Sequence, residues 1–264
     1  INGDDSDFEM FNLPLRMTAG TRTSSLIPYS NYPSQNLVDA FETVNGYKVT
    51  LENTGWVCED PAFDPQSPYE NRDKRFYRAI LANGMSFKDY TIETFKGGAD
   101  DGIVSQGGSP TGYFLRKYIQ EATSFEPGKE AVSKHHWVIY RYAETLLTYA
   151  ESMVNAFNDV NYTDETYKYS ALWAINEMRK NADMPLIPSM GKDEFMERLY
   201  NEWRVEFAFE DHRFWDVRRW KIADTTQREL YGVKIEKQAD GTFNFYKNLY
   251  ETRNWRDCMY LYPI

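Results

Sequence analysis

The chain has 264 residues, 42% of them hydrophobic, so it can bury a sizeable core and lacks the composition of a disordered protein. Its 30 basic and 40 acidic residues give a formal net charge of −10. This charge argues against nucleic acid or an anionic membrane surface as the main partner, because phosphates would be repelled.

Residues 1–135 are predicted to form a loop-rich region on the ligand side of the protein. Gly, Pro, Asn, Asp and Ser recur here, and the apolar runs are short. We expect short helices over residues 36–43 and 74–81, and strands over 47–51 and 89–95. No internal repeat is visible in this region.

Aromatic residues make up 16% of the chain, with 7 Trp, 20 Tyr and 16 Phe. Most of these rings are expected to pack the core, but a ring on a rigid loop could instead stack on the face of a sugar. Five rings in Pro-, Gly- and Asn-rich stretches are therefore predicted to bind ligand: Tyr29, Tyr32, Trp56, Phe63 and Tyr69. For each ring taken singly, local packing remains the alternative.

The two cysteines, Cys58 and Cys258, form no C-x-x-C pair, so the sequence indicates neither a zinc site nor a redox motif. We expect two free, buried thiols, with a disulfide between them as the alternative. No apolar stretch approaches the length that a membrane helix needs.

A second region, residues 136–264, shows helical periodicity from its start. The first helix is expected from Tyr140 to Phe157. Its predicted buried stripe consists of apolar residues three or four positions apart: Ile139, Tyr142, Leu146, Ala150, Val154 and Phe157.

Three more helices are predicted over about residues 164–182, 192–210 and 214–223, and short connections between amphipathic helices favour antiparallel hairpins. The spacing of the helix starts, about 27 residues, is near but not equal to the ~34 residues of the helix pair in a tetratricopeptide repeat. A final β-hairpin is expected between strands at 234–237 and 242–246. The predicted fold is mainly α, with tetratricopeptide-like helical hairpins joined to a loop-rich part that contains short helices and strands.

The densest cluster of chemical groups lies between Glu202 and Trp220. Glu202, Glu206 and Glu210 are four residues apart and share one helix face. Basic residues follow on the next predicted helix and could fold back on these acids: Arg213, Arg218 and Arg219. The cluster could be a glycosidase carboxylate pair, a di-metal site, or a structural ion-pair network.

The arginines favour the structural network. A guanidinium lowers the pKa of a carboxyl group that it binds, whereas a general acid needs a raised pKa. His212 has no second histidine at ligand spacing, and the pair His135-His136 has no neighbouring carboxylate or thiol in the sequence. Nucleotide-binding and serine-hydrolase motifs are absent. The sequence therefore predicts no catalytic residue, no metal site and no cofactor.

Several segments resemble motifs of the SusD/RagB family of outer-membrane nutrient-binding proteins, and together they cover nearly all of the chain in order. These are Asn36–Phe41, Asn71-Arg-Asp-Lys-Arg75, Arg141–Glu151 (RYAETLLTYAE), Glu202–Trp220 and the closing Tyr260–Ile264. Two departures are that Asp211 stands where the family has Gly and Lys74 where it has Pro.

The resemblance implies a SusD-like α/α superhelix, of which this chain would be the C-terminal portion, since family members are roughly twice as long. It implies a Bacteroidetes surface lipoprotein on the outer face of the outer membrane, held only by an N-terminal lipid anchor that lies outside this chain. Such proteins serve polysaccharide utilisation by capturing oligosaccharides, or in some members peptides, for a SusC-like TonB-dependent transporter. They are not enzymes.

Two other functions stay open from the residues alone. One is a helical-repeat scaffold inside the cell that binds a protein or peptide, which would lack an upstream lipoprotein signal. The other, less favoured, is a glycoside hydrolase that uses Glu206 and Glu210.

Overall fold

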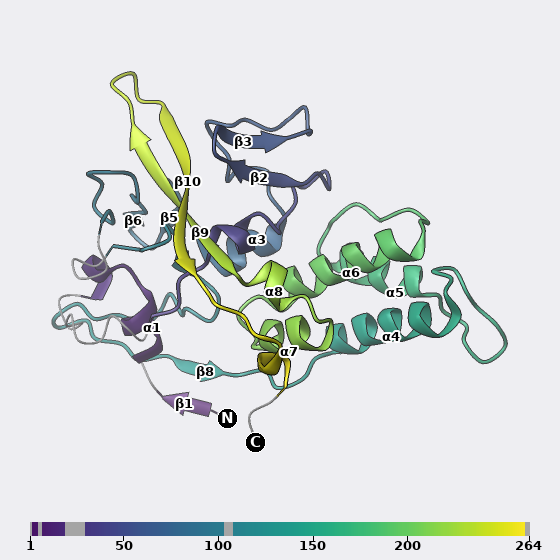
Figure 1. Cartoon of the computed structure of the whole chain (residues 1–264). Helices are drawn as coiled ribbons and strands as arrows, with labels where there is room; N and C mark the ends of the chain where they lie inside the picture. The colour runs from purple at the N-terminus through teal and green to yellow at the C-terminus, as the bar shows by residue number, and fades with distance from the viewer. Residues whose placement is uncertain (1, 5–6, 19–29, 103–107, 262–264) are drawn as a thin grey trace.

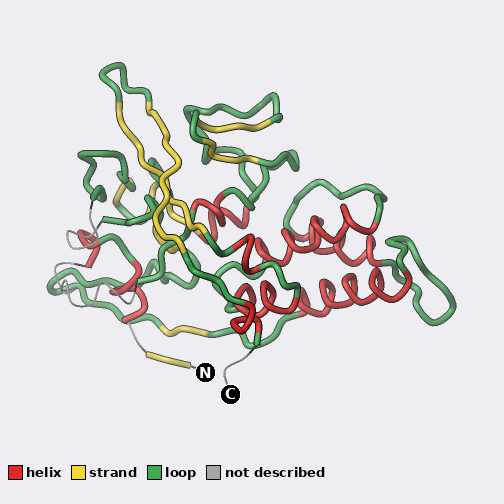
Figure 2. The backbone as a smooth tube through the Cα atoms, viewed as in Figure 1, coloured by secondary structure: helices red, strands yellow, loops and turns green. Residues whose placement is uncertain are grey.

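The computed structural model describes residues 2–4, 7–18, 30–102 and 108–261 (Figure 1). Helices account for 32% of the structure and strands for 18%. The predicted mainly-α class is therefore confirmed only in part. Most helices lie on one side of the molecule and most strands on the other, as Figure 2 shows.

The helical side is built on three neighbouring helices: α4 (Tyr142–Phe157), α5 (Ala171–Asn181) and α6 (Lys192–Glu206). They share a core of apolar side chains that includes the fully buried Leu147, Val154, Ile175, Phe195 and Leu199. Two shorter helices follow, α7 (His212–Arg219) and α8 (Ala223–Thr226). The predicted helical hairpins are thus present.

Two helix boundaries differ from the prediction for local reasons. Helix α5 begins after its N-cap Ser170, not near Asp164. The Asp164 carboxylate instead accepts hydrogen bonds from the backbone N–H groups of Thr166 (2.8 Å) and Tyr167 (2.6 Å), which holds a turn. Helix α6 ends at Glu206, shortly before Phe209 and Asp211 adopt left-handed backbone conformations (φ +61° and +64°) that a right-handed helix cannot contain.

The predicted apolar stripe of α4 is wrong at its first two positions. Ile139 precedes the helix and is 83% exposed, and Tyr142 in the first turn is 68% exposed. The stripe is buried from Leu146 to Val154, where α5 and α6 cover it, and Phe157 at its end is half-buried.

The loop-rich part contains short elements, as its many turn residues predict. Its helices are α1 (Asp7–Asn12), a 3-10 turn (Leu15–Thr18), α2 (Gln35–Val38) and α3 (Lys74–Ala79). Its strands form antiparallel pairs: β1 (Asn2–Asp4) with β8 (Lys134–His136), β2 (Val49–Glu52) with β3 (Gly55–Cys58), β4 (Ile80–Leu81) with β7 (Phe114–Leu115), and β5 (Ser86–Phe87) with β6 (Tyr90–Thr91). The strand predicted over 89–95 is confirmed only at Tyr90–Thr91.

The predicted C-terminal hairpin is present and longer than expected. Strand β9 (Glu229–Lys237) pairs with β10 (Phe243–Thr252) through a register that joins Lys237 to Phe243, and a 3-10 turn (Asp257–Tyr260) follows. The hairpin lies against the loop-rich part (Figure 1).

A second core joins the hairpin to the first region. Val233, Ile235 and Phe245 of the hairpin share a buried cluster with Phe41 and Phe76. Packing therefore crosses residue 135, and the division into 1–135 and 136–264 stays a prediction about the sequence pattern.

Two remaining features concern the cysteines and the helix lengths. Cys58 is half-buried and Cys258 is exposed, and both are free. The expectation of buried thiols is thus wrong for Cys258.

Among the described residues, no helix is both long enough and apolar enough to cross a membrane.

Candidate functional site

The three glutamates at 202, 206 and 210 form an ion-pair network, but with arginines from distant segments. Arg75 donates from one Nη to Glu202 (2.5 Å) and to Glu206 (2.8 Å). Arg141 donates to Glu206 (2.5 Å) and to Glu210 (2.8 Å). Each acid therefore has a guanidinium partner, as the structural interpretation predicted.

Two further cations complete this network, which we call the carboxylate clamp. Arg179 bonds Glu202 (3.1 Å) and Glu42 (2.8 Å), and Lys117 bonds Glu210 (2.5 Å). The clamp joins α6 to α5, to α3 and to the segment before α4, so it ties the two regions of the chain together.

The predicted partners Arg213, Arg218 and Arg219 do not take part, and that prediction is wrong. Asp211, with φ +64°, reverses the chain before α7 and directs this helix toward α4. Arg219 accordingly bonds Glu151 of α4 (2.5 Å). The guanidinium of Arg218 lies over the Phe214 ring at 3.6 Å.

The clamp does not have the electrostatics of an acid catalyst. Burial raises the pKa of Glu206, but the ion pairs with Arg75 and Arg141 outweigh it, so this pKa lies below its ordinary value. A carboxylate held ionised in this way cannot donate a proton near neutral pH. The three carboxylates of this cluster are all engaged in ion pairs.

The five predicted ligand-binding rings lie in different environments. Trp56 and Tyr69 are only 9% and 7% exposed and pack edge to face at 5.7 Å between ring centroids, so neither presents a face to solvent. Phe63 is half-buried against the same core. Tyr32 is half-buried and lines a small pocket. Tyr29 lies outside the described residues. The structure does not bring the four described rings together in one site.

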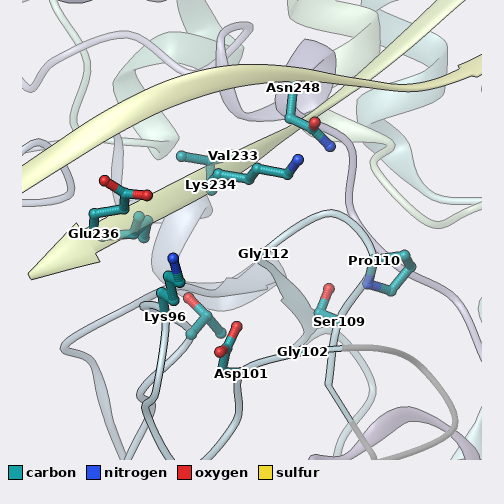
Figure 3. A pocket seen from close by; sticks show the side chains of 12 residues that line it. Lys96, Asp101, Gly102, Ser109, Pro110, Gly112, Val233, Lys234, Glu236 and Asn248 are labelled. Carbon is teal, nitrogen blue, oxygen red and sulfur yellow. The ribbon is translucent and has the colours of Figure 1, made fainter.

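A cavity of about 760 Å³ lies instead between the β9–β10 hairpin and the loops at 94–102 and 109–112 (Figure 3). We call it the strand hollow. Figure 3 shows Lys96, Asp101 and Ser109 on its loop side, and Lys234 and Glu236 on its strand side.

Backbone contacts hold the two sides of the strand hollow together. Val233 donates its N–H to the Thr111 carbonyl (2.8 Å), and Lys96 donates its N–H to the Ile235 carbonyl (2.8 Å). Gly112, at φ +81°, lies so close to β9 that an added Cβ would meet the Val233 side chain at 2.6 Å. Only glycine allows this approach.

Polar groups in the strand hollow have unused hydrogen-bonding capacity. The side chains of Lys96, Lys234, Glu236 and Asn248 make no hydrogen bond or ion pair with any described residue. The buried hydroxyl of Thr94 also has no hydrogen-bond partner among the described residues. The hollow thus offers donors and acceptors side by side, which suits a ligand rich in hydroxyl groups.

The sequence contained only a weak signal for this site. Along β9, Val233 and Ile235 face the core while Lys234 and Glu236 face outward, the two-residue alternation of a half-buried strand. No pattern placed Lys96 opposite them, because that proximity depends on how loop 94–102 packs on β9.

Helical hairpins, an attached β-hairpin and an open polar hollow together define a helical-hairpin protein with a polar surface cavity. The chain belongs to the SusD family, whose sequence model matches residues 21–264. SusD-like protein P38 of Formosa agariphila is 24% identical over 227 residues, which are 79% of this chain and 37% of that protein.

Solved structures of related proteins agree with this assignment. A SusD-like protein from Bacteroides fragilis superposes with a TM-score of 0.68 and 32% identity, over 87% of this chain and 43% of that one. A SusD-like carbohydrate-binding protein from the same species gives a TM-score of 0.65 and 25% identity, over 88% and 45%. The chain spans less than half the length of these relatives.

Proposed function

We propose that this protein captures oligosaccharides at the outer surface of the outer membrane and passes them to a SusC-like TonB-dependent transporter, without catalysing a reaction. Membership of the SusD family supports this, as does the similarity to a structure described as carbohydrate-binding. A lipid anchor outside this chain would be its only attachment to the membrane.

The observation that carries the proposal is the set of polar groups in the strand hollow that have no partner among the described residues. A sugar hydroxyl both donates and accepts hydrogen bonds, so it can bond an ammonium and a carboxylate at once. Lys96, Lys234 and Asn248 supply donors, and Glu236 supplies an acceptor. Two lysines balance the carboxylates of Glu236 and Asp101, so the hollow suits the uncharged residues of a glycan.

The test is calorimetric titration of the full chain with a panel of neutral oligosaccharides. Lys96→Ala and Asn248→Ala are each expected to weaken binding about five- to tenfold, the value of one lost hydrogen bond. Asn244→Ala is the matched control, because Asn244 lies on the same strand, exposed and outside the hollow. Tight binding of a peptide, with none of any glycan, would refute glycan capture.

The non-catalytic part of the proposal rests on the carboxylate clamp. A hydrolase acting through Glu206 and Glu210 would need one of them free to give up a proton, but both are bound by Arg141. Incubation with the same glycans should release no reducing sugar. Release that Glu206→Gln abolishes would show that the protein is an enzyme.

A further inference from the structure

A second, smaller cavity of about 290 Å³ lies where the end of α6, the start of α7 and the start of β9 meet. We call it the arginine pocket. Among the residues that line it are Arg204, Arg213, Tyr32, Phe209, Phe214 and Leu230. It combines two guanidiniums with several aromatic rings.

Neither arginine of the pocket has a partner among the described residues. The Arg204 and Arg213 side chains make no hydrogen bond or ion pair there, and the Nε of Arg213 is buried without an acceptor. Arg72 is fully buried and also leaves its Nε without an acceptor, but its two Nη groups donate to three backbone carbonyls, and Arg75 binds three carboxylates. A buried guanidinium with no partner at all is costly, so the pair Arg204 and Arg213 favours a bound group that would satisfy them.

The pKa values of the two arginines are consistent with guanidiniums that lack a close carboxylate partner. Burial, together with the charge of Arg213, lowers the pKa of Arg204 to about 9, although Asp39 pulls it upward. Burial also lowers the pKa of Arg213, against the attraction of Asp216. Among the residues that line the pocket, the two arginines are accompanied by a single carboxylate, that of Asp211, while Asp39 and Asp216 act from outside the lining.

Backbone strain lies at the same place. Phe209 has φ +61°. A bulky residue seldom adopts this left-handed conformation, and such strain is found most often at functional sites. The conformation places Phe209 in the wall of the pocket.

We infer that the arginine pocket binds the anionic group, a carboxylate or sulfate ester, of an acidic sugar residue. The two guanidiniums would hold the oxygens of this group through charge-assisted hydrogen bonds. The rings of Tyr32 and Phe214 would cover the apolar face of the sugar. The inference rests on the proposed glycan capture and narrows its ligand to glycans that carry negative charge.

Tetragalacturonic acid and its fully methyl-esterified form provide the test, because they share one backbone and differ in charge. Titration of the full chain at low ionic strength should show about tenfold to a hundredfold tighter binding of the acid form. Arg204→Met and Arg213→Met should remove this preference without weakening the neutral form. Arg78→Met is the control, since Arg78 is exposed on α3 and its side chain makes no hydrogen bond or ion pair with a described residue.

A second measurement keeps the anion site separate from glycan capture. Sodium sulfate stabilises folded proteins in general, so the readout is the difference: the rise in thermal midpoint over sodium chloride of equal ionic strength should be larger for the wild type than for the methionine variants. Arg204→Lys and Arg213→Lys keep the charge but lose the bidentate geometry, so they should give intermediate shifts.

Each outcome decides one of the two ideas. Equal affinity for both forms of the glycan, with no added effect of sulfate, would overturn the anion site while leaving glycan capture intact. Sulfate stabilisation that the variants lose, with no glycan bound in any form, would keep the anion site and refute glycan capture.

Discussion

Replacement of Arg75 by Met should weaken the tie between the two regions of the chain. Arg75 binds Glu202, Glu206 and Asp73, with its side chain only 13% exposed. Removing one partner of a buried ion pair costs about 3–5 kcal/mol, because the remaining charges lose their compensation. Here Glu202 keeps Arg179 and Glu206 keeps Arg141, so the loss should fall near the lower end, about 3 kcal/mol.

For a chain of this size, about 3 kcal/mol corresponds to a drop of roughly 6–12 °C in the thermal midpoint. The midpoint can be followed by circular dichroism at neutral pH. Arg253→Met is the control, because the pair of Arg253 with Glu251 is largely exposed and should contribute about 1 kcal/mol or less. An Arg75→Met variant no less stable than this control would refute the account of the clamp.

The pH dependence gives a second check on Arg75. The folded-state pKa of Glu206 lies below its ordinary value, so its stabilising contribution is present above about pH 4.5 and is lost as the pH falls through the folded pKa. The difference in stability between wild type and Arg75→Met should therefore narrow as the pH falls below about 4.5. A difference that widens instead would contradict the sign of this shift.

Three further substitutions test other parts of the structure. Gly112→Val should clash with Val233, lower the thermal midpoint and abolish glycan binding in calorimetry, because it forces the loop away from β9. Asp211→Gly should leave stability unchanged or raise it by up to about 1 kcal/mol in urea unfolding, whereas Asp211→Val should lower it by about 1–2 kcal/mol, because only the latter resists φ +64°. Trp56→Ala should cost about 3–5 kcal/mol in the same assay, as expected for a buried core ring, and a smaller loss would favour a surface role.

Local signals predicted the helical side and the final hairpin well. The turn at Ala239-Asp240-Gly241 and the alternation on either side of it place the hairpin without any knowledge of the fold, and Gly241 takes φ +91° there. Helix α6 begins at Lys192, as its acidic first turn predicts. The start of α5 was mistaken because Asp164 suits a helix start and a side-chain-held turn equally well.

For the carboxylate clamp, the sequence predicted that the glutamates form ion pairs but not which residues pair with them. Four-residue spacing places Glu202 and Glu206 on one face of α6 and calls for cations opposite them, whereas Glu210 lies beyond the end of the helix and joins them through the turn at Phe209. Their partners, Arg75 and Arg141, lie far away in the sequence, and the nearby Arg219 is turned away by the reversal at Asp211. Spacing along a helix reports neighbours on that helix and nothing about which distant segment packs against it.

By itself, the sequence determined the helical hairpins, the β-hairpin, the structural nature of the acidic cluster and the family, because each depends on local periodicity, turn residues or motifs read in order. Only the tertiary structure decided which rings are buried, that Lys96 faces Lys234 across a hollow, and that Arg204 and Arg213 meet without a partner among the described residues. Burial and the pairing of charges depend on contacts between segments far apart in the chain, and no local pattern encodes them.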